Sequence, residues 1–75
     1  MTTLNKVKQV IADYMCVPVD DIEDNASLKN DIGMDSLDIL DCSMKIYEVF
    51  GIVTYVDDWK GIETIGDVVV LVEGK

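Results

Sequence analysis

The sequence contains no histidine and no arginine, and these two absences exclude several kinds of function. Without histidine the chain cannot build a Ser-His-Asp or Cys-His catalytic centre of its own, and it lacks the commonest zinc ligand. Six lysines oppose fifteen acidic residues, which gives a formal net charge of -9. Nucleic acid is not expected as a partner, because binding it requires basic side chains that neutralise phosphates. We therefore expect a chain with no catalytic residues and no metal site.

Cysteine and long apolar segments are also scarce. Cys16 and Cys42 are too few for a disulfide framework and too far apart for a metal knuckle, so we expect both to be small buried side chains. The longest apolar run, Val68 to Val72, is far shorter than the roughly 20 residues that cross a bilayer. The first six residues lack the apolar core of a signal peptide. These features predict a cytoplasmic monomer without membrane insertion, folded as a single domain over residues 1–75.

The first part of the chain predicts one helix and a long loop. From Leu4 to Met15 apolar residues recur every three or four positions, which is typical of an amphipathic helix. Thr2 or Thr3 can cap its start, and Pro18 ends it. From Pro18 to residue 32 the sequence is acidic and irregular, which predicts a loop pinned to the core by a few apolar anchors, with one short helical turn. An EF-hand does not fit this loop, because the residues that fall at its ligand positions are wrong.

A second helix is predicted to begin after Gly33-Met34. Asp35 is a good N-cap residue, Asp38 stands at the capping-box position three residues later, and Gly51 marks the end. The inward stripe of this helix is predicted from its apolar spacing as Leu37, Leu40, Met44 and Tyr47, joined by Ile46 and Phe50.

The remainder of the chain is harder to interpret. Residues 52–56 have strand-like composition but no partner strand, and residues 57–60 can form one helical turn that ends at Gly61. The valine-rich tail suits a strand by propensity, but Thr64 followed by Asp67 is a capping-box pattern. Because a lone strand cannot satisfy its backbone, we predict a helix there. The chain is therefore expected to be all-α.

Ser36 is the residue with the clearest chemical possibility. It lies at the first position of the second predicted helix, where its hydroxyl should face water and where unpaired backbone N–H groups favour an anion such as a phosphate ester. No histidine can activate it, so it suits a substrate of another protein better than a nucleophile in its own right. From this local pattern alone, an ordinary helix-start serine remains the simpler interpretation.

The segment from Gly33 to Asp38 resembles the Gly-x-Asp-Ser-Leu motif of acyl carrier proteins. The similarity extends along the chain, through Asn25-Ala26-Ser27-Leu28 before the motif and Thr64-Ile65 after it. Length, acidity and lack of arginine agree with that family. The resemblance implies a small four-helix bundle, with three main helices, one short helix and a long first loop. It also implies that a separate phosphopantetheinyl transferase, with Mg²⁺, attaches 4'-phosphopantetheine from coenzyme A to Ser36. The terminal thiol of this arm would carry acyl groups as thioesters.

The resemblance further implies that the second helix docks onto basic patches of the enzymes that load and use the acyl group. Eight acidic residues and one lysine lie between Asp20 and Asp41, a net charge of -7. Such a surface suits fast, transient docking by electrostatic steering. The predicted partner-binding residues are Met34, Asp35, Leu37, Asp38, Asp41, Met44 and Glu48.

Some positions depart from the family pattern. Thr54-Tyr55 stands where the family commonly has Ile-Pro, so the start of the short third helix is expected to differ. Cys42 and Ser43 are smaller or more polar than the aliphatic residues that usually line the acyl pocket. We take these departures as a hypothesis of a specialised set of partners rather than general fatty acid synthesis.

Two alternative functions stay open. The same arm can load an amino acid, as in peptidyl or D-alanyl carrier proteins. Alternatively the chain is an unmodified helical interaction module that docks through Ile39, Tyr47 and Val49.

Overall fold

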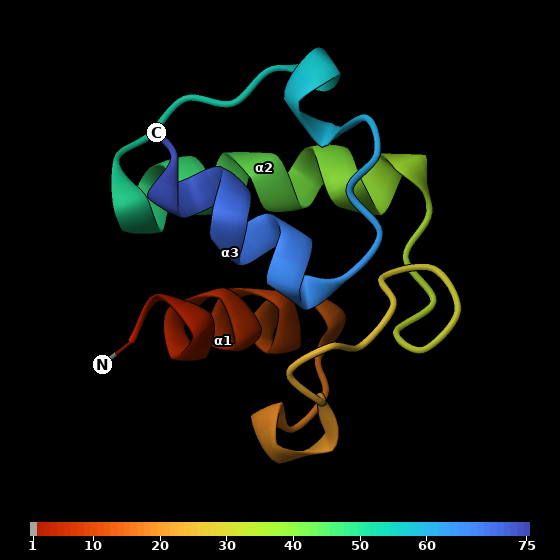
Figure 1. Ribbon diagram of the computed structural model, residues 1–75. Coiled ribbons are helices and arrows are strands. Elements are labelled where there is room, and N and C mark those ends of the chain that lie inside the picture. The colour runs from red at the N-terminus through yellow and green to blue at the C-terminus, as the bar shows by residue number, and fades with distance from the viewer. Residues whose placement is uncertain (1) are drawn as a thin grey trace.

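Three α-helices separated by long connections form the fold of the computed structural model, which describes residues 2–75. Figure 1 shows α1 on one side of the molecule and α2 on the other, with α3 crossing between them in this view, and α1 packs against both α2 and α3. No β-strand occurs within residues 2–75, so the all-α prediction is confirmed. The helices are α1 (Thr3–Met15), α2 (Ser36–Phe50) and α3 (Ile65–Glu73), and the 3₁₀ turns are η1 (Val19–Asp21) and η2 (Val56–Trp59).

A four-helix bundle is not confirmed, because the expected short helix is a 3₁₀ turn. η2 has four residues, which leaves room for only a few hydrogen bonds between residues three apart. At its start the carboxylate of Asp58 accepts a hydrogen bond from the N–H of Tyr55 at 2.8 Å. Soon after its end, Gly61 has a φ of 82°, a left-handed conformation that ends the helical path.

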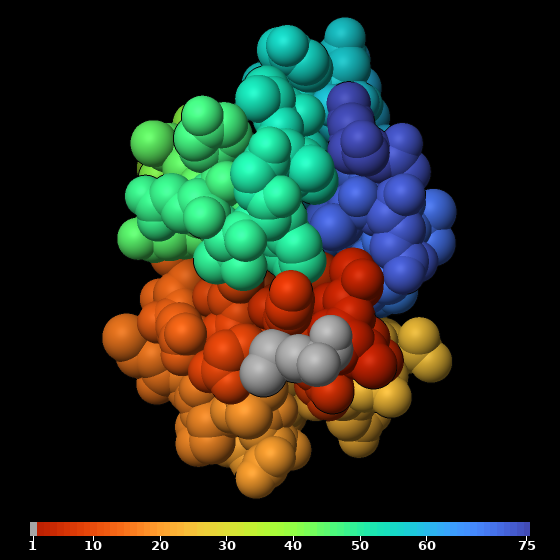
Figure 2. Space-filling view, turned by 90° about the vertical axis from the view of Figure 1, so that its left-hand side faces the viewer, coloured from red at the N-terminus to blue at the C-terminus, as the bar shows by residue number. Residues whose placement is uncertain are grey.

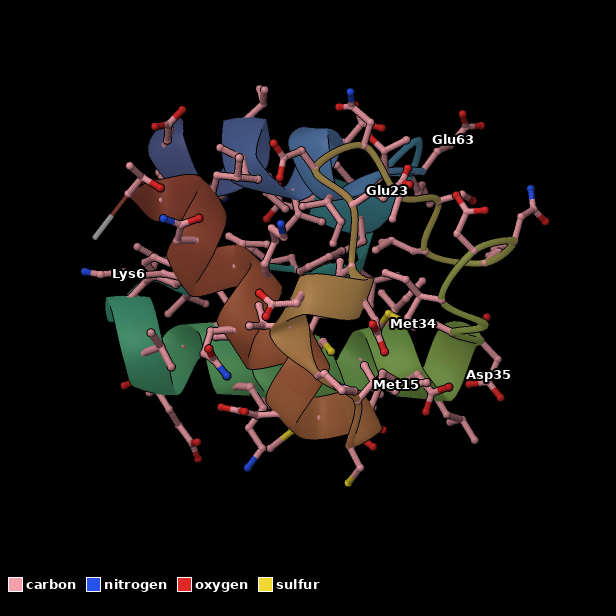
Figure 3. All side chains as sticks on the ribbon, turned by 90° about the horizontal axis from the view of Figure 1, so that it is seen from below. Lys6, Met15, Glu23, Met34, Asp35 and Glu63 are labelled. Atoms are coloured by element: carbon pink, nitrogen blue, oxygen red, sulfur yellow. The ribbon has the colours of Figure 1, made fainter. Side chains whose placement is uncertain are left out.

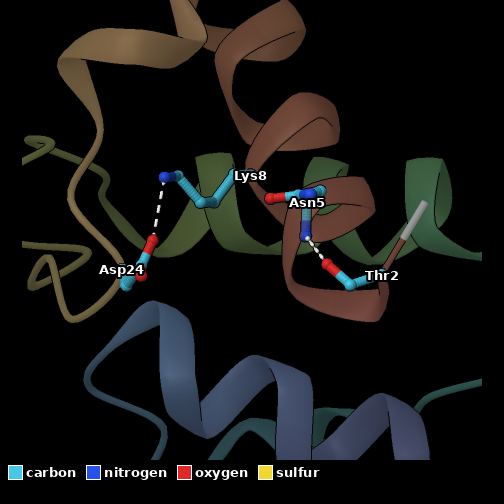
Figure 4. Close-up of polar contacts among 4 residues, drawn as sticks. All are labelled: Thr2, Asn5, Lys8 and Asp24. Atoms are coloured by element: carbon cyan, nitrogen blue, oxygen red, sulfur yellow. Dashed lines mark hydrogen bonds and ion pairs between the residues drawn. The ribbon is translucent and has the colours of Figure 1, made fainter.

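The start and end of α1 are set by local hydrogen bonds. The hydroxyl of Thr2 accepts from the N–H of Asn5 at 3.1 Å (Figure 4), which confirms Thr2 as the N-cap residue. The helix ends at Met15, and Cys16 turns the chain with a left-handed φ of 58°. Cys16 is exposed, so the prediction that both cysteines are buried was wrong for this one. Cys16 lies beyond the last residue of α1, so it is not on the helix face that contacts the core.

The long loop between α1 and α2 is fixed to the rest of the molecule by buried side chains. Ile22, Ala26 and Leu28 are at most 5% exposed, which confirms the prediction of a loop with apolar anchors. The predicted short helical turn is η1. Lys8 of α1 adds an ion pair with Asp24 at 2.9 Å, which joins the loop to the first helix (Figure 4).

Backbone hydrogen bonds join this loop to the beginning of α3. The N–H of Leu28 donates to the carbonyl of Glu63 at 2.9 Å, and the N–H of Ile65 donates to that of Ala26 at 3.0 Å. These bonds surround an isolated antiparallel bridge between Ser27 and Thr64. No local sequence pattern indicates this pairing, because it joins residues more than thirty positions apart.

The tail forms a helix, as predicted, and its capping box is present. The Thr64 hydroxyl accepts from the N–H of Asp67, and the Asp67 carboxylate accepts from that of Thr64, both at 3.2 Å. Ile65, Val68 and Val72 are buried on the face that α3 turns to the core. Figure 2, seen from the end at which α2 finishes, shows α1 below both α2 and α3 in one continuous surface.

The inward face of α2 differs from the prediction. Leu37, Leu40, Met44 and Tyr47 are between 51% and 71% exposed, so they do not form the core stripe. Ile46 is buried and Phe50 is half-buried, as predicted, but their companions on the core face are Cys42 and Ile39. Both sets recur at helical spacing, so periodicity alone cannot decide which set faces α1. The packing of α2 against α1 determines which set faces the core.

We predict that Asp67 makes stability sensitive to acid. Hydrogen bonds from the N–H groups of Glu63 and Thr64 lower the pKa of this carboxyl below its ordinary value of 3.8. Because the pKa is lower in the folded state, the stabilisation is present above the unfolded value and is lost as the pH falls through the folded one. Asp67→Asn should therefore lower the urea midpoint at pH 7 and lower it much less at pH 3. Glu63→Gln is the matched control, and an equal loss from Asp67→Asn at both pH values would contradict the prediction.

Candidate functional site

Ser36 begins α2 at the end of the long loop, as the sequence predicted. Asp35 is the N-cap residue, and its carboxylate accepts from the N–H of Asp38 at 2.9 Å. The Asp38 carboxylate accepts in return from the N–H of Asp35 at 3.1 Å. This reciprocal capping box fixes the backbone on both sides of Ser36 and leaves the side chain of Ser36 itself exposed.

Ser36 differs from the two other serines of the chain. The hydroxyl of Ser27 accepts a hydrogen bond from the N–H of Asn30 at 3.2 Å, and the hydroxyl of Ser43 donates to the carbonyl of Leu40 at 2.6 Å. Both of these serines are half-buried, whereas Ser36 is exposed and its hydroxyl makes no hydrogen bond within residues 2–75. Ser36 is thus the serine whose oxygen is free to react.

Gly33 and Met34 shape the turn that leads into this site. Gly33 has a φ of 85°, a left-handed conformation in which glycine is strongly preferred. Met34 is only 4% exposed, and its N–H donates to the carbonyl of Leu28 at 2.8 Å. Figure 3 shows Met34 directed towards the helices while Asp35 lies at the outer end of α2. The prediction that Met34 supplies an apolar contact for partners was therefore wrong, because this side chain anchors the turn in the core.

An open apolar groove of about 560 Å³ lies beside Ser36, between α2 and η2. Trp59 is held at its edge by a hydrogen bond from the indole N–H to the hydroxyl of Thr54 at 3.0 Å. Ser43 lines this groove, but Cys42 was wrongly expected to do so, since it is 1% exposed and faces the core. The groove is lined by Lys29, Ser36, Leu37, Ile39, Leu40, Ser43, Thr54, Tyr55, Val56, Trp59 and Lys60.

The acidic residues near Ser36 are connected to α1 by Tyr14. Its hydroxyl lies 3.0 Å from Asp38 Oδ1 and 2.9 Å from Asp41 Oδ2, so one proton is shared between two carboxylates. The hydrogen bond to Asp41 is the largest cause of a raised pKa of Tyr14, followed by burial and the bond to Asp38. Tyr14 thereby holds both carboxylates in fixed positions on the first turns of α2. Sequence analysis missed this role, because the pairs lie 24 and 27 residues apart.

The other predicted partner-binding residues are distributed along α2. Leu37 and Met44 are 71% and 63% exposed, so both are accessible. Glu48 is exposed and lies 3.8 Å from Lys45 in a surface ion pair. Because each helical residue advances by about 1.5 Å, Glu48 lies roughly 18 Å along the helix from Ser36. Only the acids of the first turns therefore adjoin the serine.

The patch proposed for an unmodified interaction module does not form one surface. Ile39 is half-buried in the core side of the groove, while Tyr47 and Val49 are exposed. Two residues two positions apart point in very different directions on a helix, so Tyr47 and Val49 face different sides of α2. These three residues cannot contact one partner surface together.

A family model described as a phosphopantetheine attachment site matches residues 5–72. The chain belongs to this family of phosphopantetheine-dependent carrier proteins. Members of the family hold 4'-phosphopantetheine covalently on a serine and are generally non-catalytic. The carrier domain described here offers an exposed serine with an unbonded hydroxyl beside an apolar groove, which fits such a group. Within residues 2–75 no helix is both long and apolar enough to span a membrane.

Proposed function

We propose that this carrier domain bears its 4'-phosphopantetheine arm on Ser36 and carries acyl intermediates on it. It would deliver them to partner enzymes of fatty acid, polyketide or related biosynthesis. The observation that carries this proposal is the free, exposed hydroxyl of Ser36 at the start of α2, next to the apolar groove. Ser27 and Ser43 do not compete, because their hydroxyls are engaged in hydrogen bonds and half-buried.

The chemistry divides between this chain and its transferase. The Ser36 oxygen forms a new bond to the phosphorus that bears the pantetheine in coenzyme A, and the bond from that phosphorus to the nucleotide phosphate breaks. The chain contains no histidine, and the carboxylates of Asp35 and Asp38 already accept backbone hydrogen bonds, so we assign the base that takes the Ser36 proton to the transferase or its metal-bound solvent. The capping box holds the backbone of Ser36 rigid during this encounter. When attached, the arm supplies a terminal thiol for thioester chemistry.

Modification of Ser36 is tested by intact mass. Incubating the apo chain with coenzyme A, Mg²⁺ and a broad-specificity phosphopantetheinyl transferase should add about 340 Da, the mass of the arm. Ser36→Ala should gain nothing, whereas Ser43→Ala, the matched control on the same helix, should gain the full mass. Modification that persists in Ser36→Ala would contradict the assignment.

The nature of the groove favours acyl cargo over aminoacyl cargo. Its lining includes Lys29 and Lys60 but no aspartate or glutamate. An aminoacyl group brings an ammonium, which such a surface repels and cannot pair with. The apolar residues of the lining suit a hydrocarbon chain instead. Mass spectrometry of the loaded protein from its native host distinguishes the two, since an amino acid on the thiol would contradict the acyl assignment.

We also propose that the first turns of α2 are the docking surface for partner enzymes. Asp35, Asp38 and Asp41 supply negative charge around Ser36, and Leu37 and Met44 offer exposed apolar contacts. Glu48 extends the acidic surface toward the end of the helix. Since the segment from residue 20 to residue 41 carries a net charge of -7, it attracts a basic partner patch from a distance.

Charge reversal at Asp41 tests this docking surface. Asp41→Lys should reduce kcat/KM of the transferase for the apo chain by about five- to tenfold at low salt, mostly by slowing association. Glu73→Lys makes the same charge change at the end of α3 and should have little effect. Added salt should narrow the difference between the two variants, because it screens the attraction. Equal losses in both variants would contradict a localised docking surface.

A further inference from the structure

The groove beside Ser36 has a charge opposite to that of the chain. Fifteen acidic residues are distributed over the sequence, yet none lines the groove. Two of the six lysines, Lys29 and Lys60, do line it. The lining of the groove is therefore positive and largely apolar on a protein of net charge -9, while Asp35 and Asp38 flank Ser36 outside this lining.

Backbone pairing brings the segments that carry these two lysines together next to the start of α2. Lys29 follows Leu28, whose N–H donates to the carbonyl of Glu63. The carbonyl of Leu28 accepts from the N–H of Met34 at 2.8 Å, and Met34 lies two residues before Ser36. Lys60 follows η2 directly, three residues before Glu63. Figure 1 shows the segment after η2 passing the N-terminal half of α2 on its way to α3. The loop, η2 and the start of α2 thus meet at one place.

Neither lysine is neutralised strongly. Lys60 lies 3.1 Å from Asp57, but both side chains are more than three-quarters exposed, and such surface pairs contribute little. Lys29 makes no ion pair within the part of the chain that the structure describes, residues 2–75. Both ammonium groups are therefore available to an anion bound in the groove that Ser36 also lines.

We propose that Lys29 and Lys60 bind the phosphodiester of the arm on Ser36 and direct the arm into the groove, towards Leu40 and Trp59. The inference rests on the proposed attachment at Ser36. A phosphodiester carries one negative charge at neutral pH, and it must lie within a few bonds of the Ser36 oxygen. Ser36 and Ser43 both line the groove, which therefore follows α2 for about 10 Å. That length accommodates the apolar part of pantetheine next to the phosphate.

Trp59 is the single tryptophan, so its indole N–H resonance reports on the groove. In the holo protein with a free thiol, NMR at low salt should show a shifted Trp59 indole resonance relative to the apo protein, with NOEs from pantetheine methyl protons to Trp59. The double variant Lys29→Gln/Lys60→Gln should reduce the ratio of docked to free arm, by roughly threefold per lysine. The control Lys6→Gln/Lys45→Gln, with the same charge change outside the groove, should match the unaltered chain.

Every other result contradicts either the role of the two lysines or the proposed function. Full modification by mass without any response of Trp59, or an equal response in both double variants, overturns the role of the lysines while leaving Ser36 as the attachment site. A response that appears only when the thiol carries an acyl group with a carboxylate also overturns it, because the bound anion is then the cargo. A chain that gains no mass contradicts the proposed function itself, and this inference with it.

Discussion

Replacing Ile46 by alanine is expected to lower the free energy of unfolding by about 2–5 kcal/mol, the range for a large-to-small change in a core. Ile46 is completely buried, in the middle of α2, where this helix contacts the rest of the core. A domain of this size is stabilised by only a few kcal/mol, so the variant should be partly or fully unfolded at room temperature. Urea unfolding followed by circular dichroism measures the change.

Met44→Ala is the matched control on the same helix. Met44 is 63% exposed, so its truncation should change the free energy of unfolding by no more than about 0.5 kcal/mol. Apolar spacing placed both Met44 and Ile46 on the inward face of α2, whereas in the structure only Ile46 of this pair is buried, so the two variants test the orientation of the helix. A large loss from Met44→Ala together with a small loss from Ile46→Ala would contradict the orientation of α2.

The two cysteines are expected to differ by orders of magnitude in reactivity. Burial, reinforced by the negative charges of Asp38 and Asp41, raises the pKa of the Cys42 thiol from 9.0 to about 12. Because only the thiolate reacts, at pH 8 this shift lowers the reactive fraction of Cys42 about 1,000-fold. Cys16 is exposed at the end of α1 and should react readily. In the apo chain, a disulfide reagent such as DTNB should therefore titrate one thiol in the folded state and two in denaturant.

Cys16→Ser provides the control for this titration. The folded variant should show no rapidly reacting thiol, and denaturation should expose one. Rapid reaction of Cys42 in the folded variant, at a rate similar to that of Cys16 in the unaltered chain, would contradict its burial. The result also decides whether a thiol reagent directed at the arm would meet competition from this chain, and Cys16 is the only competitor expected.

The ends of the helices could be predicted from the sequence because they depend on local chemistry. A capping side chain binds a backbone N–H only two or three residues away, so Thr2, the Asp35–Asp38 pair and the Thr64–Asp67 pair are visible as short patterns. Gly51 likewise ends α2 through its own left-handed conformation. The capping-box pattern of Thr64 and Asp67 correctly predicted a helix for the valine-rich tail, although its residues have a propensity for a strand.

The orientation of α2 could not be predicted in this way, because it depends on contacts between distant residues. Helical spacing suits both the exposed set that contains Leu40 and the buried set that contains Ile46. Met34 illustrates the same limit, since its burial follows from the path of the loop around Leu28. In each case the sequence indicates an apolar residue, and only the packed structure indicates which way it faces.

Only the local part of the candidate site could be predicted from the sequence, because the rest depends on contacts between distant residues. The short motif located Ser36 at the start of a helix, and the structure places it there. The groove requires residues from the loop, α2 and η2 together, and Tyr14 reaches Asp38 and Asp41 from another helix. No local pattern encodes these contacts. They place Ser36 beside an apolar groove and two fixed carboxylates.

Tandem mass spectrometry of the chain co-expressed with a phosphopantetheinyl transferase tests the central claim most directly. The account predicts that the added mass of about 340 Da resides on the peptide containing Ser36, and that fragmentation releases pantetheine from this residue. Ser27 and Ser43 should remain unmodified on their own fragments. The added mass on either of those serines, or a chain that returns at its unmodified mass from a transferase active on other carriers, would contradict it.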